Sequence, residues 1–179
     1  GWMSPQTWLA HGIHFTNDEI RRLGTTGIGV SHCPHSNMSL ASGICPACSL
    51  ETSGSPLGIG VDGSASNDAS NAMEEVRQAL MLQRLGSGTT AVGHADVLRW
   101  ATEGGARCLG RDDIGQIERG LEADLALFRL DELRHSGAHD PLAALVLCGA
   151  GRADRVMIGG IWRVEEGHAP NIDEPDLIH

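Results

Sequence analysis

The first half of the chain contains three short apolar runs, each of which ends in a polar residue and is followed by a helix pattern. These runs, at residues 8–11, 27–32 and 57–62, predict strands. Thr16 and Glu19 form a capping box after the first run, and residues 49–52 fall in a short helix that Gly54 closes. Strand and helix units in a row predict a parallel sheet with right-handed crossovers.

Two longer helices follow the third strand. Residues 69–85 form an amphipathic pattern with apolar side chains along one side, namely Met73, Val76, Leu80 and Leu85. Residues 95–109 form the second helix, which Gly110 is placed to terminate. These helices complete an α/β array that covers the first 110 residues.

The character of the sequence changes after this array. Residues 124–130, 155–158 and 161–164 predict short strands, and Gly159 with Gly160 forms a two-residue hairpin turn between the last two. Residues 169–179 are rich in proline and acid and predict a loose terminus. The chain is therefore expected to carry a small β element after the βα array.

The composition excludes several classes of partner and cofactor. The 179 residues carry 13 basic and 23 acidic side chains, and the net charge of -10 argues against nucleic acid or an anionic membrane as a partner. There is no lysine, which excludes a phosphate-binding loop of the G-x-x-x-x-G-K-[ST] type and a pyridoxal Schiff base. No apolar stretch is long enough to span a bilayer and no leader opens the chain, so we expect a cytoplasmic protein.

Cysteines offer one candidate metal site. Five cysteines without a leader favour reduced thiols over disulfides. Cys45 and Cys48 have C-x-x-C spacing, and with Cys33 and His35 they could form a structural zinc module. This module is a hypothesis of a different class from an enzyme.

A second candidate site lies at the strand ends. His11, His32 and Asp62 each follow or end a predicted strand, and the carboxyl ends of parallel strands form the binding face of α/β proteins. Taken singly, these residues could instead be a buried histidine, a turn anchor and a loop cap. The surrounding motifs favour chemistry.

Three consecutive motifs carry a family resemblance. They are L-A-H-G-I-H-F at residues 9–15, S-H-C-P-H-S-N-M at 31–38 with S-G-I at 42–44, and G-V-D-G-S-A-S-N-D at 60–68. Together they resemble the metal-dependent amidohydrolase superfamily, in its branch of aminohydrolases acting on purines, pteridines and triazines. Residues 115–126 and 138–146 are most similar to the members of this branch that deaminate 8-oxoguanine, and the resemblance covers residues 2–168.

The resemblance implies a fold and a reaction. It implies that residues 1–110 are units six to eight of a (β/α)₈ barrel and that residues 111–168 belong to a small β-sandwich with its connections. It also implies hydrolytic deamination of an oxidised purine or related heterocycle. The alternatives are a triazine, pterin or guanine aminohydrolase, or an inactive relative. Gly12 and His35 stand where the family commonly has Cys and Thr. The resemblance therefore does not define the substrate pocket.

The same resemblance implies roles for individual residues. Asp62 matches the family's metal ligand that also shuttles a proton, and His11 matches the histidine that orients water and substrate. Ser64 and Asn67 are further candidates for substrate binding, although we favour a role with Ser66 in ordering the loop. One divalent metal ion is implied, zinc rather than iron. His14 is expected at a helix entry or in packing. Five further histidines are expected on the surface or in loops, and none of the six is given chemistry: His94, His135, His139, His168 and His179.

Part of the family's metal site is missing from this sequence. The family requires a His-x-His pair at the first strand and a His-x-x-Glu at the fifth, and the chain contains neither. A catalytic metal needs about three protein ligands, so Asp62 alone does not hold it. We therefore expect the N-terminal half of the same enzyme as a partner, and the isolated chain to be marginal in stability and inactive. A homo-oligomer is compatible with the sequence.

Overall fold

A three-stranded parallel sheet organises the first half of the protein. The computed structural model describes residues 1–177, in which β1 (Trp8–Ala10), β2 (Gly29–His32) and β3 (Leu57–Ile59) pair in the order β1-β2-β3. The three predicted strands and their parallel pairing are confirmed. Each strand is shorter than its apolar run, and His11 and Asp62 lie beyond the ends of β1 and β3.

Helices connect these strands as the capping signals predict. Helix α1 (Asn17–Thr26) begins with the Thr16–Glu19 capping box, in which both reciprocal hydrogen bonds are present. Two short helices, α2 (Pro34–Ser39) and α3 (Ala47–Ser53), lie between β2 and β3. Gly54 ends α3 with φ 92°, a left-handed conformation that glycine adopts without strain.

Helix α4 (Ala72–Ser87) packs its apolar face into the core. Asn71 caps its first turn, and Val76, Ala79 and Leu80 are buried. Leu85 does not belong to this face, because it is 79% exposed. The inward stripe continues from Leu80 at a spacing of three, which reaches the buried Gln83, so a helix period of 3.6 turns Leu85 toward solvent.

The second long helix is continuous but contains a π-helical insertion. It consists of α5 (His94–Arg99), the π segment η1 (Trp100–Gly104) and α6 (Gly105–Cys108), and it packs on β3. Gly110 has φ 67° just beyond its end, as the sequence predicts. The core between sheet and helices is one cluster of buried apolar side chains that includes Ile28, Val30, Leu50, Leu57, Leu80 and Trp100.

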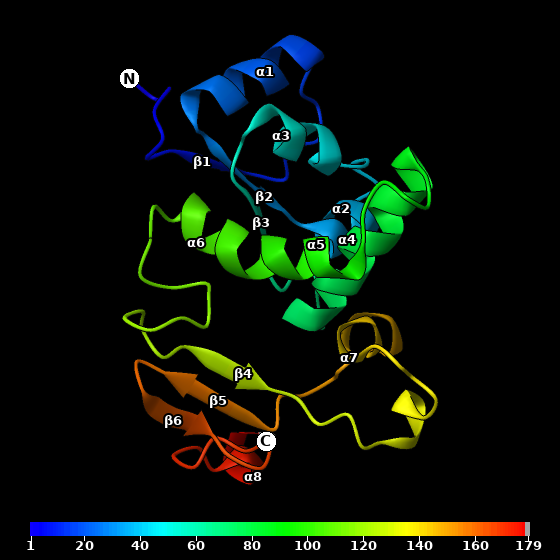
Figure 1. The fold of residues 1–179 in the computed structure, drawn as a ribbon, viewed down its shortest axis with the longest axis vertical. Helices are drawn as coiled ribbons and strands as arrows, with labels where there is room; N and C mark the ends of the chain where they lie inside the picture. The colour runs from blue at the N-terminus through cyan, green and yellow to red at the C-terminus, as the bar shows by residue number, and fades with distance from the viewer. Residues whose placement is uncertain (178–179) are drawn as a thin grey trace.

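A separate antiparallel sheet lies beyond these helices (Figure 1). It consists of β4 (Leu125–Leu127), β5 (Arg155–Ile158) and β6 (Ile161–Val164), in that order. Gly159 and Gly160 connect β5 to β6 with φ values of 55° and 78°, which matches the positive φ pair of a type I′ turn. The short elements η2 (Leu133–His135), α7 (Pro141–Ala143) and η3 (Ala144–Cys148) lie between β4 and β5.

One expectation for the C-terminal third differs from the structure. His135 is 6% exposed rather than on the surface, because it ends the short helical turn η2, which packs against η3. Within the expected loose terminus, Glu174–Leu177 form the short helix α8. His179 lies outside the described residues. None of the helices in the described part of the chain is long and apolar enough to cross a membrane.

Candidate functional site

The structure brings His11 and Asp62 together at the carboxyl edge of the parallel sheet. His11 follows β1 and Asp62 follows β3, and the Nε2 atom of His11 lies 3.7 Å from Oδ2 of Asp62. Both side chains are accessible, with 38% and 33% of their surfaces exposed. An imidazole and a carboxylate that face each other in this way can share or transfer a proton.

Both residues have an unusual backbone conformation. His11 has φ 64° and Asp62 has φ 62°, in the left-handed region that non-glycine residues seldom occupy. A conformation of this kind costs about 1 kcal/mol or more and persists only where the surroundings enforce it. The turns therefore hold the two side chains at the sheet edge at the expense of local stability.

Hydrogen bonds keep Asp62 ionised. The Ser36 hydroxyl donates to Oδ2 of Asp62 over 2.6 Å, and the Ser66 hydroxyl lies 3.2 Å from the same oxygen. These bonds, led by that of Ser36 and followed by the backbone N–H of Gly63, lower the pKa of Asp62 below its ordinary value. The carboxylate is thus available as a base or as a ligand for a cation.

His11 is held from its other side. Its Nδ1 atom lies 3.0 Å from Oδ1 of Asn37, a side chain that is only 1% exposed. Ser36 and Asn37 are consecutive residues of α2, so one short helix contacts both members of the pair. Neither residue was expected to have a role, although both lie in the motif at residues 31–38.

His32 is the third residue predicted at this edge, and its environment is different. It is fully buried at the end of β2, and neither ring nitrogen has a hydrogen-bond partner among the described residues. Burial, with a smaller contribution from the nearby His11, lowers the pKa of His32 to about 4. His32 is therefore neutral at physiological pH.

This burial predicts a pH dependence of stability. An unfolded histidine binds a proton below pH 6.5, whereas folded His32 resists protonation until about pH 4, so stability is lost as pH falls through this window. We expect the free energy of unfolding to be about 2 kcal/mol lower at pH 5 than at pH 7 because of this residue. Urea unfolding at both pH values measures this difference in unfolding free energy. In His32→Leu the difference between pH 5 and pH 7 should be smaller by about 2 kcal/mol. An equal pH dependence in both proteins would contradict the prediction.

Hydrogen bonds from buried side chains order the loop after β3. The Asn67 side chain is 1% exposed and donates to the Val61 carbonyl and to Oε1 of Glu75, over 2.8 Å in each case. The Ser66 hydroxyl lies 3.2 Å from the Gly63 carbonyl, whereas Ser64 is exposed. The placement of Asn67 and Ser66 favours loop ordering, and Ser64 has the exposure that a substrate contact requires.

An open hollow of about 520 Å³ lies beside His11. Residues of the segment between β1 and α1 line it, including Gly12, His14 and Phe15, together with Leu40 and Ser42 from beyond α2. Its volume falls in the range of about 300–1,000 Å³ that is usual for small-molecule sites. A small ligand in this hollow would reach the imidazole.

The cysteine cluster does not form the proposed zinc module. Within residues 1–177, no group of three or more His, Cys, Asp or Glu side chains could hold a metal ion. Burial raises the pKa of the Cys45 thiol to about 12 and also raises that of Cys33, so both are neutral thiols. His35 instead lies 3.1 Å from the amide nitrogen of Gln78.

The absence of a complete ligand group among the described residues also limits what the His11–Asp62 pair can bind. Asp62 is an exposed, ionised carboxylate, which suits a divalent cation. A zinc site nevertheless takes about three protein ligands, and the described residues supply no such set. The donor chemistry fits a metal only if further ligands come from outside this chain.

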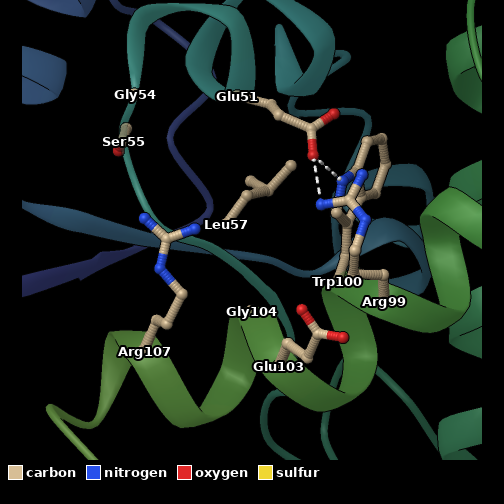
Figure 2. A pocket seen from close by; sticks show the side chains of 9 residues that line it. All are labelled: Glu51, Gly54, Ser55, Leu57, Arg99, Trp100, Glu103, Gly104 and Arg107. Carbon is tan, nitrogen blue, oxygen red and sulfur yellow. Dashed lines mark hydrogen bonds and ion pairs between the residues drawn. The ribbon is translucent and has the colours of Figure 1, made fainter. Parts of the chain in front are cut away.

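A second pocket lies at the amino end of β3, opposite the His11–Asp62 pair, and some of the side chains that line it bind one another (Figure 2). The Glu51 carboxylate accepts the indole N–H of Trp100 over 2.8 Å and pairs with Arg99 over 2.7 Å. The cavity measures about 50 Å³, which is too small for a heterocyclic ligand. These contacts stabilise the packing of α3 against the long helix.

Comparison with known proteins places these features in a family. The sequence model of the Amidohydrolase family matches residues 3–162. The chain is 62% identical over 178 residues to an 8-oxoguanine deaminase of Pseudomonas aeruginosa, covering 99% of this chain and 40% of that protein. It is 41% identical over 163 residues to an isoxanthopterin deaminase of an unknown prokaryotic organism, covering 83% and 34%.

Solved structures of zinc-containing enzymes are also similar to this chain. An adenosine deaminase from Xanthomonas campestris with bound zinc superposes with a TM-score of 0.94 at 36% identity, covering 98% of this chain and 41% of that one. The zinc-containing atrazine chlorohydrolase from Arthrobacter aurescens gives a TM-score of 0.94 at 32% identity, covering 99% and 40%. The chain thus spans about two-fifths of the length of these relatives.

Proposed function

The chain belongs to the amidohydrolase family, and we propose that it forms the C-terminal part of a metal-dependent enzyme that hydrolytically deaminates an oxidised purine, with an 8-oxoguanine-like ring as the substrate. The observation that carries this proposal is the juxtaposition of His11 and an ionised Asp62 at the carboxyl edge of a parallel sheet. The high similarity to an 8-oxoguanine deaminase over nearly the whole chain favours this substrate over a triazine, pterin or guanine.

Asp62 has the chemistry of a proton shuttle in this reaction. Water adds to the ring carbon that bears the amino group, the Asp62 carboxylate takes one proton from that water, and it passes the proton to the departing nitrogen. The C–N bond breaks and ammonia leaves, and the second proton of the water moves to the adjacent ring nitrogen as the ring carbonyl forms. The low pKa of Asp62 keeps its carboxylate unprotonated before each turnover.

His11 complements this carboxylate. Its Nε2 atom faces Oδ2 of Asp62, so it can orient the attacking water and contact the oxygen of the tetrahedral adduct. The hollow beside His11 is large enough for a purine. Ser64, in the loop after β3, is a further candidate for contact with the substrate. Asn67 keeps only the ordering role.

A divalent metal ion, for which we favour zinc, would activate the water by lowering its pKa from about 15.7 to about 7. Asp62 is the residue of this chain that would hold it. The remaining ligands would come from the N-terminal part of the enzyme, because the described residues contain no complete ligand set. We therefore propose that the 179-residue chain has no deaminase activity by itself.

The open edges of the parallel sheet support this arrangement. Within the described residues β1 has no strand on its outer side, and Trp8 on this strand is 47% exposed. An unpaired strand edge is a template for a further strand. We propose that β1, β2 and β3 are strands six to eight of the family's barrel within residues 1–110, that residues 111–168 belong to its β-sandwich, and that residues 169–179 are a terminal segment.

An assay of the completed enzyme tests the proposal. The completed enzyme is defined here as this chain joined to the part of the P. aeruginosa relative that it does not span. With zinc it should release ammonia from 8-oxoguanine faster than from isoxanthopterin or guanine, and the 179-residue chain alone should release none. Turnover that favours another heterocycle would move the substrate within the family. No turnover of any of them would identify an inactive relative.

A further inference from the structure

A single buried carboxylate connects the two segments that meet at Asp62. Glu75, in the first turn of α4, is 0% exposed, and both of its oxygens accept hydrogen bonds from outside that helix. Oε2 accepts the backbone N–H of His35 over 3.0 Å, and Oε1 accepts the side-chain amide of Asn67 over 2.8 Å. His35 lies in the first turn of α2, and Asn67 lies in the loop after β3. The carboxylate therefore fixes one segment relative to the other.

Helix α2 depends on Glu75 for its first turn. Within the described residues Cys33 precedes this helix without a side-chain capping bond, and Pro34 at the first position has no N–H. The N–H of His35 is thus left without a partner inside the helix, and the Glu75 carboxylate accepts it. The next residue, Ser36, carries the hydroxyl that donates to the carboxylate of the candidate site over 2.6 Å. A shift of this turn would therefore move that hydroxyl.

The second contact reaches the backbone beside Asp62. The amide nitrogen of Asn67 donates to Glu75 and to the carbonyl of Val61, over 2.8 Å in each case. Its amide oxygen accepts the backbone N–H of Ser70 over 3.2 Å. The nitrogen thus has two acceptors and the oxygen has a donor, which defines the orientation of the amide. Because Val61 directly precedes Asp62, this contact constrains the backbone that carries the Asp62 carboxylate.

Burial gives these contacts their importance. Glu75, Asn67 and Ser36 are at most 1% exposed, so water does not compete for their hydrogen bonds. Asp62 itself is accessible and has φ 62°, a conformation that persists only where the surroundings enforce it. The buried contacts, rather than a preference of its own backbone, therefore hold Asp62 in place.

We propose that Glu75 is a positioning residue for the deamination, because its buried carboxylate fixes the Ser36 hydroxyl and the backbone at Asp62 relative to one another. Glu75 is fully buried, so it acts through these contacts and not on the substrate. The effect on turnover rests on the proposed function, whereas the geometry of Ser36 and Asp62 does not. Groups that orient a reacting side chain in this way are worth about 10–100-fold in activity.

Glu75→Gln tests the proposal with almost no change of shape. Glutamine has one acceptor oxygen and one donor nitrogen, so it cannot accept from both His35 and Asn67. In the completed enzyme we expect kcat to fall by about 10–100-fold while KM changes little.

Two neighbouring residues of α4 provide matched controls. Glu74→Gln removes an exposed charge, and Val76→Ala removes buried methyl groups without touching the hydrogen bonds of Glu75. We expect both controls to keep the parent kcat, although Val76→Ala should lower the unfolding midpoint. Parent kcat in Glu75→Gln, or an equal loss of kcat in Val76→Ala, would contradict the positioning role.

A double variant tests whether Glu75 acts through Asn67. Asn67→Ala removes the contact to the loop and leaves the bond between Glu75 and His35 intact. If both residues act on Asp62 through this contact, the double variant should lose less kcat than the product of the two single losses. Losses that multiply would show independent roles and count against the proposal.

The geometry is measured without substrate or turnover. In crystal structures of the completed enzyme we expect the hydrogen bond from Ser36 to Asp62 in the parent and its loss in Glu75→Gln. An unchanged bond in the variant would overturn the proposal, and so would its absence from the parent even if no variant folds. Failure of the deaminase assay together with the expected change in geometry would overturn the proposed function alone.

Discussion

Replacing Asp62 with Asn is expected to lower kcat of the completed enzyme by about 10²–10⁴-fold, which is the usual contribution of a general acid or base. An amide cannot take a proton from the attacking water or return one to the leaving nitrogen. It is also a weaker ligand for a divalent cation than a carboxylate. We therefore expect less bound zinc in the variant, measured by metal analysis of the same samples that are assayed for ammonia release.

The choice of Asn and of a matched control separates chemistry from folding. Asn adopts left-handed backbone conformations readily, so the φ of 62° at this position is retained without added strain. Asp68 is an exposed aspartate in the same loop, and Asp68→Asn removes the same charge without touching the pair. If both variants lost activity equally, the charge of the loop would be responsible. Zinc that is retained by Asp62→Asn but lost on Cys45→Ser would favour the cysteine module.

The order and pairing of the strands could be predicted because the pattern is local. Each strand is an apolar run that ends in a polar residue, and a helix with a recognisable cap or stop follows it, as with Thr16, Glu19 and Gly54. The position of Leu85 was mispredicted, because counting apolar residues over a long helix ignores the 3.6-residue period. The burial of His135 depends on contacts with η3, which lies about ten residues later in the sequence.

The candidate site could be predicted only at the level of the sheet edge. Parallel strands bring their carboxyl ends together, so His11 and Asp62 were expected to be neighbours. The residues that orient them were not expected. Ser36 and Asn37 reach their partners across 26 residues of sequence, and Glu75 reaches His35 across 40. Such contacts depend on how α2 and α4 pack, and no spacing within one element reveals them.

The long helix approaches β3 closely at the amino end of the strand, opposite the candidate site. Gly104 lies where that helix crosses the start of the strand, and a Cβ atom at this position would come within 1.8 Å of the Leu57 carbonyl oxygen. The neighbouring Gly105 faces open space, with nothing within 4 Å of its Cβ position. Both residues have right-handed helical φ angles near -60°, so the contact with Leu57, and not the backbone conformation, distinguishes them.

Opposite effects are therefore expected from the same substitution at adjacent positions. Gly104→Ala should destabilise the fold by about 3 kcal/mol, because the strand or the helix must move away to relieve an overlap with rigid backbone. Gly105→Ala should stabilise it by about 0.5–1 kcal/mol, because alanine is the better helix former. Urea unfolding of both variants of the completed enzyme measures the difference. Equal effects of the two substitutions would mean that the helix does not approach β3 this closely.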